Sequence, residues 1–226
     1  SSHAAGFKHP EYEKFVPVGT FEEALVGGPE SPALHAYINS YDNGILQADD
    51  MVRRIFEALD AKGYLHDSLA IITSDHGEAF GEHVFLGHGF KLWQENLHVP
   101  LIIYDTDMPS VGYELDGLVS LLDVAPTILK RVELPAPASW RGLALVGERA
   151  KGRCTFHEVI QHDQVFAVVC ERGDKLYKLL LEGALDGKHE RLLFELREDP
   201  GEDHNLIGAA PEVAAELGER LKNHFL

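Results

Sequence analysis

The sequence predicts an α/β fold with a small antiparallel β subdomain at its C-terminal end, on three observations. A helical pattern covers residues 31–62, an apolar segment at residues 69–73 runs directly into polar residues, and several short strand-like segments follow residue 147. A helix followed by a buried strand and a polar loop is the order expected of an α/β sheet. We therefore expect an α/β core over residues 1–147 and a subdomain over residues 148–226.

The first thirty residues are rich in Pro and Gly and read as loop, and a helix is predicted directly after them. Ser31 is a favourable N-cap and Pro32 suits the first helical turn. Apolar and aromatic residues then recur in steps of three and four from Leu34 to Leu59, which keeps one apolar face over about eight turns. Gly63 is placed to end the helix.

The segment LAIIT at residues 69–73 is too short for a helix and is apolar on both faces, as a central parallel strand would be. We expect Ile71 and Ile72 to be buried on opposite faces of a sheet. VPLIIYD at residues 99–105 predicts a second strand of this kind. A short helix is predicted from Asp123.

The pattern after residue 147 changes to short strands of the antiparallel kind. A tight turn around Gly173 joins two of them, which predicts a hairpin. An amphipathic helix closes the chain. These elements are CTFHEVI, VFAVVCE, KLYKLLLE and RLLFEL, followed by the helix PEVAAELGERLKNHFL.

Composition limits the partners. The chain carries 37 acidic and 20 basic residues, a net charge of −17, which repels nucleic acid and anionic lipid. An anionic substrate would need a local positive centre, which a bound metal ion supplies.

No apolar run approaches the roughly 18–20 residues of a membrane span. The chain starts at SSHAAG without an initiating Met, and we expect it to be a piece of a longer protein.

Asp75 and His76 stand at the carboxyl end of the LAIIT strand, where open α/β sheets bind ligands. Gly77 lets the backbone turn, so that both side chains can converge on one centre. Oxygen and imidazole nitrogen together suit Mn²⁺, Zn²⁺ or Fe better than Ca²⁺. SDHG alone is equally compatible with an Asp helix cap beside a structural His.

Three further histidines follow. His88 has Gly on both sides, which permits close backbone approach to a ligand. His83 and His98, taken singly, are better explained as surface or packing residues. No HExxH motif is present, which excludes the common zinc-protease arrangement.

The stretch SDHGEAFGEH…GHG…VPLII closely resembles the metal-site motif of the sulfatase-like hydrolases within the alkaline phosphatase superfamily. Three more segments resemble that family in the same order: the long helix INSYDNGILQADDMVRRIFEAL, then VSLLDVAPTIL, then LLFELREDPGEDHNL. The resemblance spans nearly the whole chain. It implies the C-terminal part of an alkaline-phosphatase-like α/β/α sandwich, with a small antiparallel C-terminal subdomain.

The resemblance also implies site residues. Asp75 and His76 match two ligands of a divalent metal ion, with Mn or Zn favoured and Ca an option. His88 matches a histidine that faces substrate or a second metal in the phosphoethanolamine-transferase branch, and it is our candidate general acid. His3 resembles another active-site histidine of that branch through a shorter match. Lys91 is poorly spaced for the site lysine of true sulfatases.

The implied function is a metal-dependent hydrolase or transferase acting on sulfate or phosphate esters, with a small anionic ester or a lipid head group as substrate. His76 stands where aryl-sulfatases usually have Asn, which favours the phosphoethanolamine- and phosphoglycerol-transferase-like branch. The family's nucleophile and first metal carboxylates lie in an N-terminal half that is absent here. We therefore expect this chain alone to be inactive. The alternative is a non-catalytic binding or regulatory module with the sulfatase fold.

Expectations for partners and compartment follow from the same resemblance. The chain is expected to pair with its own N-terminal half, or to self-associate through an exposed sheet edge, and not to bind nucleic acid. Many relatives carry N-terminal membrane helices, which favours the periplasmic face of the cell envelope, with the cytoplasm still open. Cys154 and Cys170 lack the sulfatase-type Cys-x-Pro-x-Arg context and are interpreted as ordinary buried cysteines; a disulfide between them stays open as an alternative but is not implied.

Overall fold

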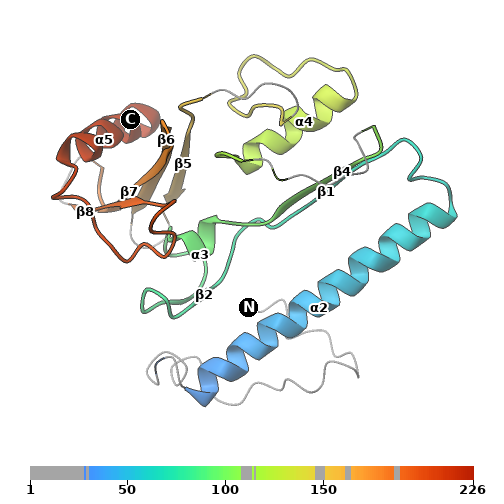
Figure 1. Ribbon diagram of the computed structural model, residues 1–226, viewed down its shortest axis with the longest axis horizontal. Helices are drawn as coiled ribbons and strands as arrows, with labels where there is room; N and C mark the ends of the chain where they lie inside the picture. Colours follow the sequence, from blue (N-terminus) through green and yellow to red (C-terminus); the bar gives the residue numbers. More distant parts are fainter. Residues whose placement is uncertain are drawn as a thin grey trace. The chain divides into compact units, whose positions relative to one another are not determined.

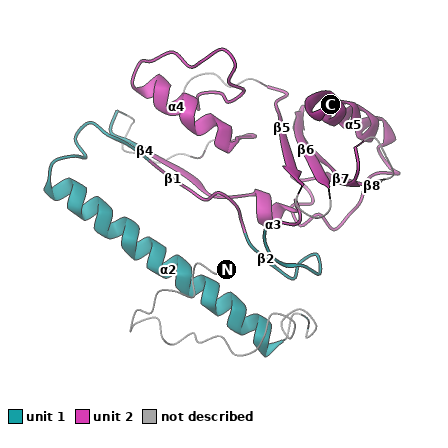
Figure 2. Ribbon diagram, turned by 180° about the vertical axis from the view of Figure 1, so that it is seen from behind, with its two compact units in different colours: residues 1–70, 78–88, 104–110 teal, residues 71–77, 89–103, 111–226 magenta. Residues whose placement is uncertain are grey.

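The computed structural model describes residue 28 and residues 31–107, 114, 116–145, 151–160, 164–185 and 189–226. Figure 2 shows its two compact units, one of residues 1–70, 78–88 and 104–110, the other of residues 71–77, 89–103 and 111–226. The predicted division near residue 147 remains a prediction, because residues 146–150 lie outside the described part. Every helix within the described ranges is too short or too polar to cross a lipid bilayer.

The predicted long helix is confirmed as α2, Pro32–Ala61 (Figure 1). Ser31 occupies the N-cap position and Pro32 the first turn, while Gly63 has a φ of 73° just past the C-terminal end. That left-handed conformation favours glycine.

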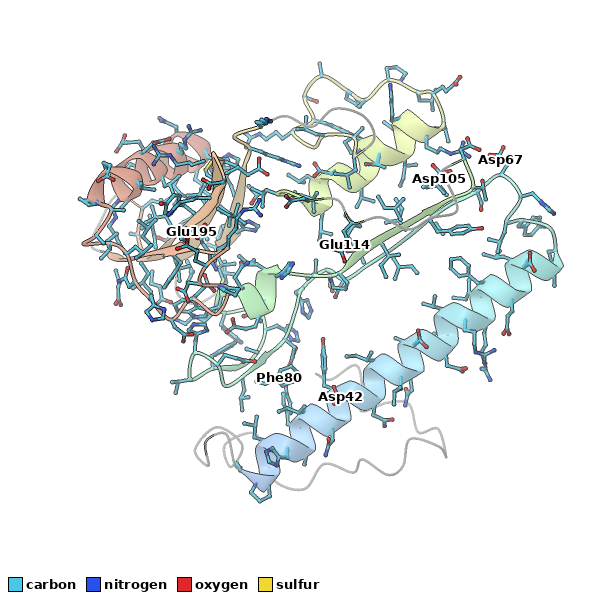
Figure 3. The ribbon with its side chains drawn as sticks, viewed as in Figure 1. Asp42, Asp67, Phe80, Asp105, Glu114 and Glu195 are labelled. Atoms are coloured by element: carbon cyan, nitrogen blue, oxygen red, sulfur yellow. A yellow bond between two sulfur atoms is a disulfide. The ribbon has the colours of Figure 1, made fainter. Side chains whose placement is uncertain are left out.

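The N-terminal part of α2 packs on a short hairpin that the sequence did not predict. Its strands are β2, Ala79–Phe80, and β3, Leu86–Gly87, paired antiparallel. Leu34 and Leu86 form a small buried cluster. Phe80 makes edge-on contacts with the rings of Tyr37 and Tyr41, and Figure 3 shows it beside the turn of α2 that carries Asp42. The hairpin is thereby anchored to the helix.

The two apolar strands are confirmed as β1, Leu69–Thr73, and β4, Leu101–Asp105, which pair with each other. The expected burial of Ile71 and Ile72 is wrong for the described structure, since both are half-buried. The physical reason is that β1 has only β4 as a described neighbour. One edge of the strand is then unpaired and its faces are incompletely covered. The side chain of Thr73 donates to the backbone oxygen of Pro100 at 2.8 Å and fixes the end of the strand.

A short helical segment follows β4, as predicted. It begins with a 3-10 turn, η3, Leu121–Asp123, and continues as α4, Val124–Arg131. Ser120 and Asp123 form a reciprocal capping box, in which each side chain accepts from backbone N–H groups of this turn.

The predicted antiparallel subdomain is confirmed as a four-stranded sheet and a closing helix. The sheet has the order β5-β6-β7-β8, and Gly173, with a φ of 65°, forms the predicted turn between β6 and β7. All three strand pairs are antiparallel. The elements are β5 Cys154–Val159, β6 Val165–Arg172, β7 Lys175–Gly183, β8 His189–Glu195 and α5 Pro211–Phe225.

Both faces of this sheet are covered. Leu217 and Leu221 of α5 are fully buried against one face, and burying a leucine stabilises a fold by about 1.5–3 kcal/mol. The other face packs on Leu92, Trp93 and the short helix α3, Gln94–Leu97. The segment that follows the site motif is therefore part of the packing of the C-terminal sheet.

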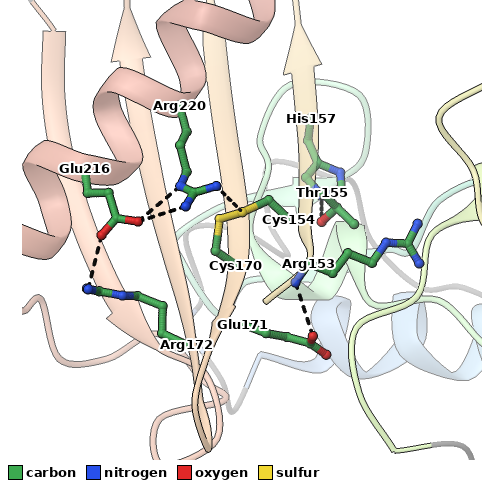
Figure 4. Close-up of a disulfide and its surroundings, with 9 residues drawn as sticks. All are labelled: Arg153, Cys154, Thr155, His157, Cys170, Glu171, Arg172, Glu216 and Arg220. Atoms are coloured by element: carbon green, nitrogen blue, oxygen red, sulfur yellow. Dashed lines mark hydrogen bonds and ion pairs between the residues drawn. A yellow bond between two sulfur atoms is a disulfide. The ribbon is translucent and has the colours of Figure 1, made fainter. Parts of the chain in front are cut away.

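The interpretation of Cys154 and Cys170 as ordinary buried cysteines is wrong, because the two form a disulfide (Figure 4). The β5–β6 register places them directly opposite each other, with Cα atoms 4.1 Å apart. Directly opposed residues of antiparallel strands lie within disulfide reach. Arg220 of α5 approaches Cys154 Sγ at 3.7 Å, and Glu216 contacts both Arg220 and Arg172.

Candidate metal centre

Asp75 and His76 converge beyond the end of β1, as predicted. His76 Nε2 lies 3.7 Å from Asp75 Oδ1, and the His76 backbone N–H donates to the same oxygen at 3.1 Å. The Ser74 hydroxyl donates to the His76 backbone oxygen at 2.7 Å, which tightens the turn. Two ligands that each lie about 2.0–2.2 Å from one metal ion must approach to about this separation. The Asp75 side chain is 89% exposed, so it is open to an incoming ion.

Gly77 allows the backbone of the site motif to lie against the backbone of α3, in addition to allowing the turn that the sequence indicated. Its N–H donates to the backbone oxygen of Asn96 at 2.9 Å. A Cβ atom at Gly77 would stand 2.0 Å from the backbone oxygen of Glu95. Glycine is needed here because the backbone of the motif lies directly against the backbone of α3, and this approach fixes the loop that carries His76.

The position of His88 is restrained by the backbone on either side of it and by a side-chain contact with Glu78. Gly87 and Gly89 have φ angles of 92° and 89°, so both glycines that flank His88 use the left-handed region. On the side-chain side, His88 Nδ1 lies 2.7 Å from Glu78 Oε2. The hydroxyl of Tyr37 in α2 donates to the other oxygen of Glu78.

Glu78 is a buried carboxylate that the sequence analysis missed. Its side chain is only 4% exposed. Burial by itself raises the pKa of Glu78, but the hydrogen bonds from Tyr37 and His88 outweigh it and hold the pKa below its usual value. Tyr41 responds in the opposite sense: burial, then the charges of Glu78 and Asp42, raise its pKa. Glu78 is therefore ionised and acts as a hydrogen-bond acceptor.

His76, Glu78 and His88 come together as a group with metal-ligand chemistry. Each offers one nitrogen or oxygen atom, and these atoms lie within 4.8 Å of one another. Imidazole and carboxylate donors suit Zn²⁺ and Mn²⁺, so the donor set fits a divalent ion. Asp75 adjoins His76 but is not a member of this group.

The remaining sequence candidates are placed elsewhere. In the described part of the chain, His83 and His98 belong to no metal-ligand group. Lys91 forms an ion pair with Glu182 of β7, with Nζ 2.8 Å from Oε1. His3 lies outside the described residues.

The other family-like segments hold the fold together. Asp123 accepts hydrogen bonds from backbone N–H groups and forms an ion pair with Arg153. In the segment REDPGEDHNL, Asp199 accepts from two backbone N–H groups of its own loop, and Asn205 accepts from those of Leu193 and Ile207. Glu202 pairs with the buried Lys178. These motif residues are structural and lie outside the candidate site.

The fold matches solved structures, among them a "putative sulfatase from Bacteroides thetaiotaomicron" with a TM-score of 0.76 at 18% identity, over 98% of this chain and 49% of that one. The structure titled "BT4656 in complex with its substrate D-Glucosamine-2-N, 6-O-disulfate" superposes with a TM-score of 0.69 at 20% identity, over 95% of this chain and 44% of that one. The fold is thus an alkaline-phosphatase-like α/β fold with an antiparallel subdomain, as predicted. The chain belongs to the sulfatase family, whose sequence model, "Sulfatase", matches residues 1–134.

Two curated relatives agree with this assignment. The chain is 32% identical over 190 residues to the "Multifunctional alkaline phosphatase superfamily protein PehA" of Trinickia caryophylli, and 26% identical over 188 residues to the "Arylsulfatase" of Clostridium perfringens. Each alignment covers 75% of this chain and 36% of the relative. The chain thus spans about a third of the length of these relatives.

Proposed function

We propose that this chain forms the C-terminal part of a metal-dependent hydrolase of sulfate or phosphate esters. The observation that carries the proposal is the convergence of Asp75 and His76 at the end of β1, in a chain that belongs to the sulfatase family. In open α/β folds ligands bind just beyond the carboxyl ends of the strands, which is where these two side chains lie.

Asp75 and His76 are the residues that we propose to hold the metal ion, with Mn²⁺ or Zn²⁺ favoured and Ca²⁺ an option. A divalent ion bound there would offset the negative charge on the oxygens of the transferring group. The Ser74 hydroxyl donates to the backbone oxygen of His76 and so fixes the backbone that carries the imidazole. The side chain of Asp75 is exposed and therefore accessible to an ion from solvent.

His88 is the proposed proton donor to the leaving group, or a ligand of a second ion. Its ring is 29% exposed, so it is reachable by an ester while one nitrogen stays bound to Glu78. A histidine that carries a proton within hydrogen-bond reach of a leaving oxygen is the usual general acid. His3 remains a candidate for the same site.

The nucleophile is proposed to come from sequence that the relatives have outside the matched third. Two protein ligands are about half of a usual four-ligand set, so we expect this chain alone to bind metal weakly and to lack turnover. The competing proposal is a non-catalytic module that keeps the fold. A hydroxyl or thiol nucleophile beside an acidic pair upstream would favour the enzyme.

The substrate is proposed to be a small anionic ester or a lipid head group. Both sulfate and phosphate remain candidates: one curated relative is named an arylsulfatase, while His76 in place of Asn favours the phosphotransferase branch. We also propose the cell envelope as its compartment, and the Cys154–Cys170 disulfide supports this because disulfides persist in oxidising compartments.

The proposal is tested by assaying the full-length protein and this chain against aryl sulfates and phosphate mono- and diesters with added Mn²⁺, Zn²⁺ or Ca²⁺. Asp75→Ala and His76→Ala should each lower kcat/KM by two or more orders of magnitude in the full-length protein. His98→Ala is the matched control and should leave it unchanged. Activity that survives both site substitutions would overturn the metal assignment, and full-length protein without any turnover would favour the module.

A further inference from the structure

Tyr37, Glu78 and His88 form a connected series of hydrogen bonds that ends on an imidazole. Tyr37 donates to Oε1 of Glu78, and His88 Nδ1 lies 2.7 Å from Oε2. Both oxygens of one buried carboxylate are therefore engaged by side chains from two parts of the chain, α2 and the end of β3. Burying a carboxylate is costly, and these two contacts offset part of that cost.

This arrangement decides which nitrogen of His88 carries the hydrogen. One oxygen of the carboxylate already accepts from the Tyr37 hydroxyl and the other faces His88 Nδ1 at 2.7 Å, so we take Nδ1 as the donor to that second oxygen. In the neutral ring the other nitrogen, Nε2, then holds the lone pair. A free imidazole in water favours the opposite tautomer, so the one in the protein depends on Glu78.

The backbone around His88 supports the same orientation. Leu86 is 2% exposed and lies in the β2–β3 hairpin, in a cluster with Leu34 of α2. Glu78 directly precedes β2, and Tyr37 packs on Phe80 of the same strand. The hydroxyl thus lies on α2, and the carboxylate and the imidazole lie at the two ends of the hairpin packed against it, which keeps their spacing fixed.

We propose that Glu78 is a positioning residue that holds His88 with its hydrogen on Nδ1 and presents Nε2 to the reacting group, and that Tyr37 positions Glu78 in turn. As a general acid, His88 would give up the Nε2 proton of its doubly protonated ring and become the Nδ1–H tautomer; as a ligand of a second ion, it would use the Nε2 lone pair of that tautomer. The role of Nε2 in chemistry rests on the proposed function of His88, whereas the tautomer does not. Hydrogen-bond partners of this kind change activity by about 10–100-fold when they are removed.

The test measures the tautomer directly, by ring-nitrogen chemical shifts of ¹⁵N-labelled, metal-free chain at a pH where His88 is neutral. The His88 signals are identified by their loss in His88→Asn. The unchanged chain should show protonated Nδ1 and unprotonated Nε2. Glu78→Ala should convert the ring to the Nε2–H tautomer. Glu78→Gln should keep part of the Nδ1–H population. Tyr37→Phe should convert a smaller fraction of the ring to Nε2–H than Glu78→Ala does. Glu82→Gln, at an exposed neighbouring carboxylate that accepts from the Phe80 N–H, should change nothing.

Two outcomes would overturn the proposal: an Nε2–H tautomer in the unchanged chain, or a tautomer that stays the same in both Glu78→Ala and Tyr37→Phe. Tyr37→Phe removes a single oxygen and keeps the ring packing, so it remains informative if Glu78→Ala does not fold. In the full-length protein, Glu78→Ala should lower kcat/KM by about 10–100-fold. An inactive protein with the expected tautomer would refute the proposed function while leaving the positioning role intact.

Discussion

Arg153 and Asp123 form a two-point ion pair inside the protein. Arg153 Nη1 lies 2.5 Å from Asp123 Oδ2 and Nη2 lies 2.6 Å from Oδ1, with side chains that are 11% and 0% exposed. Asp123 also accepts the backbone N–H groups of Ser120 and Leu143. The contact joins the start of α4 to the residue before β5, so the Asp of the LLDVAPT segment organises the fold.

We expect Arg153→Ala to destabilise the protein by about 3–5 kcal/mol, because it leaves the charge of Asp123 buried without its cation. Urea unfolding followed by circular dichroism measures this. Arg197→Ala is the control, since Arg197 forms an exposed ion pair with Asp116 at 3.4 Å and should change stability little. Equal stability of the two variants would contradict the account of Asp123.

The pair Lys178–Glu202 offers a second test of buried charge. Nζ and Oε1 are 2.6 Å apart and both side chains are fully buried. Burial lowers the pKa of Lys178, partly offset by Glu202, and burial raises the pKa of Glu202, partly offset by Lys178. Lys178→Met alone should cost about 3–5 kcal/mol. Lys178→Met with Glu202→Gln should cost less than the sum of the single changes in a double-mutant cycle, and simple additivity would show that the pair is uncoupled.

The disulfide should stabilise the C-terminal sheet. Cys154 and Cys170 are 16 residues apart, and a loop of this size corresponds to about 3 kcal/mol. Dithiothreitol should lower the urea midpoint of the unchanged protein and leave that of Cys154→Ser/Cys170→Ser unaffected. Mass spectrometry of alkylated protein checks the bond itself. Two freely alkylated cysteines in non-reduced protein would show that the cross-link does not form.

His157 should make stability depend on pH. Burial, and then the charge of Lys178, lower the pKa of His157 to about 4, from about 6.5 in the unfolded chain. Between these values the unfolded state binds the proton and the folded state does not, so stability falls as pH drops from about 6.5 to 4. We expect this group to account for about 2 kcal/mol, allowing for its partial exposure. The loss of urea stability from pH 7 to pH 4.5 should be smaller in His157→Gln; equal losses would rule out this cause.

Gly77→Ala tests the close approach of the two backbones beside the site. The added Cβ would meet the Glu95 backbone oxygen, so we expect a loss of stability and a shift in the NMR signals of His76. Gly208→Ala is the control, because a Cβ there meets nothing within 4 Å. A Gly77→Ala protein with the stability and His76 shifts of the unchanged chain would contradict this role.

The elements that the sequence predicted correctly are those with local causes. The caps and spacing of α2 lie within the helix, and the short apolar runs of β6 and β7 and the turn at Gly173 lie within one hairpin. The proximity of Asp75 and His76 was predicted because they are neighbours at a strand end. Burial of Ile71 and Ile72 was not found, because burial depends on neighbouring strands and not on the strand's own residues.

The parts of the site that the sequence did not reveal depend on distant contacts. Glu78 stands in SDHGE, two residues after His76, and an acidic residue so close to the motif was the available indication. Tyr37 lies 41 residues before Glu78, and nothing in the pattern of α2 distinguishes it from a packing residue. The disulfide depends on the register of β5 and β6, which neither strand's sequence specifies.

The central claim, that Asp75 and His76 hold a catalytic metal ion, is tested most directly by the metal content of the purified full-length protein. Elemental analysis after dialysis should find bound Mn or Zn in the unchanged protein and in His98→Ala. The same measurement should find at least tenfold less in His76→Ala and in Asp75→Ala. Equal metal content in all four proteins would contradict the account.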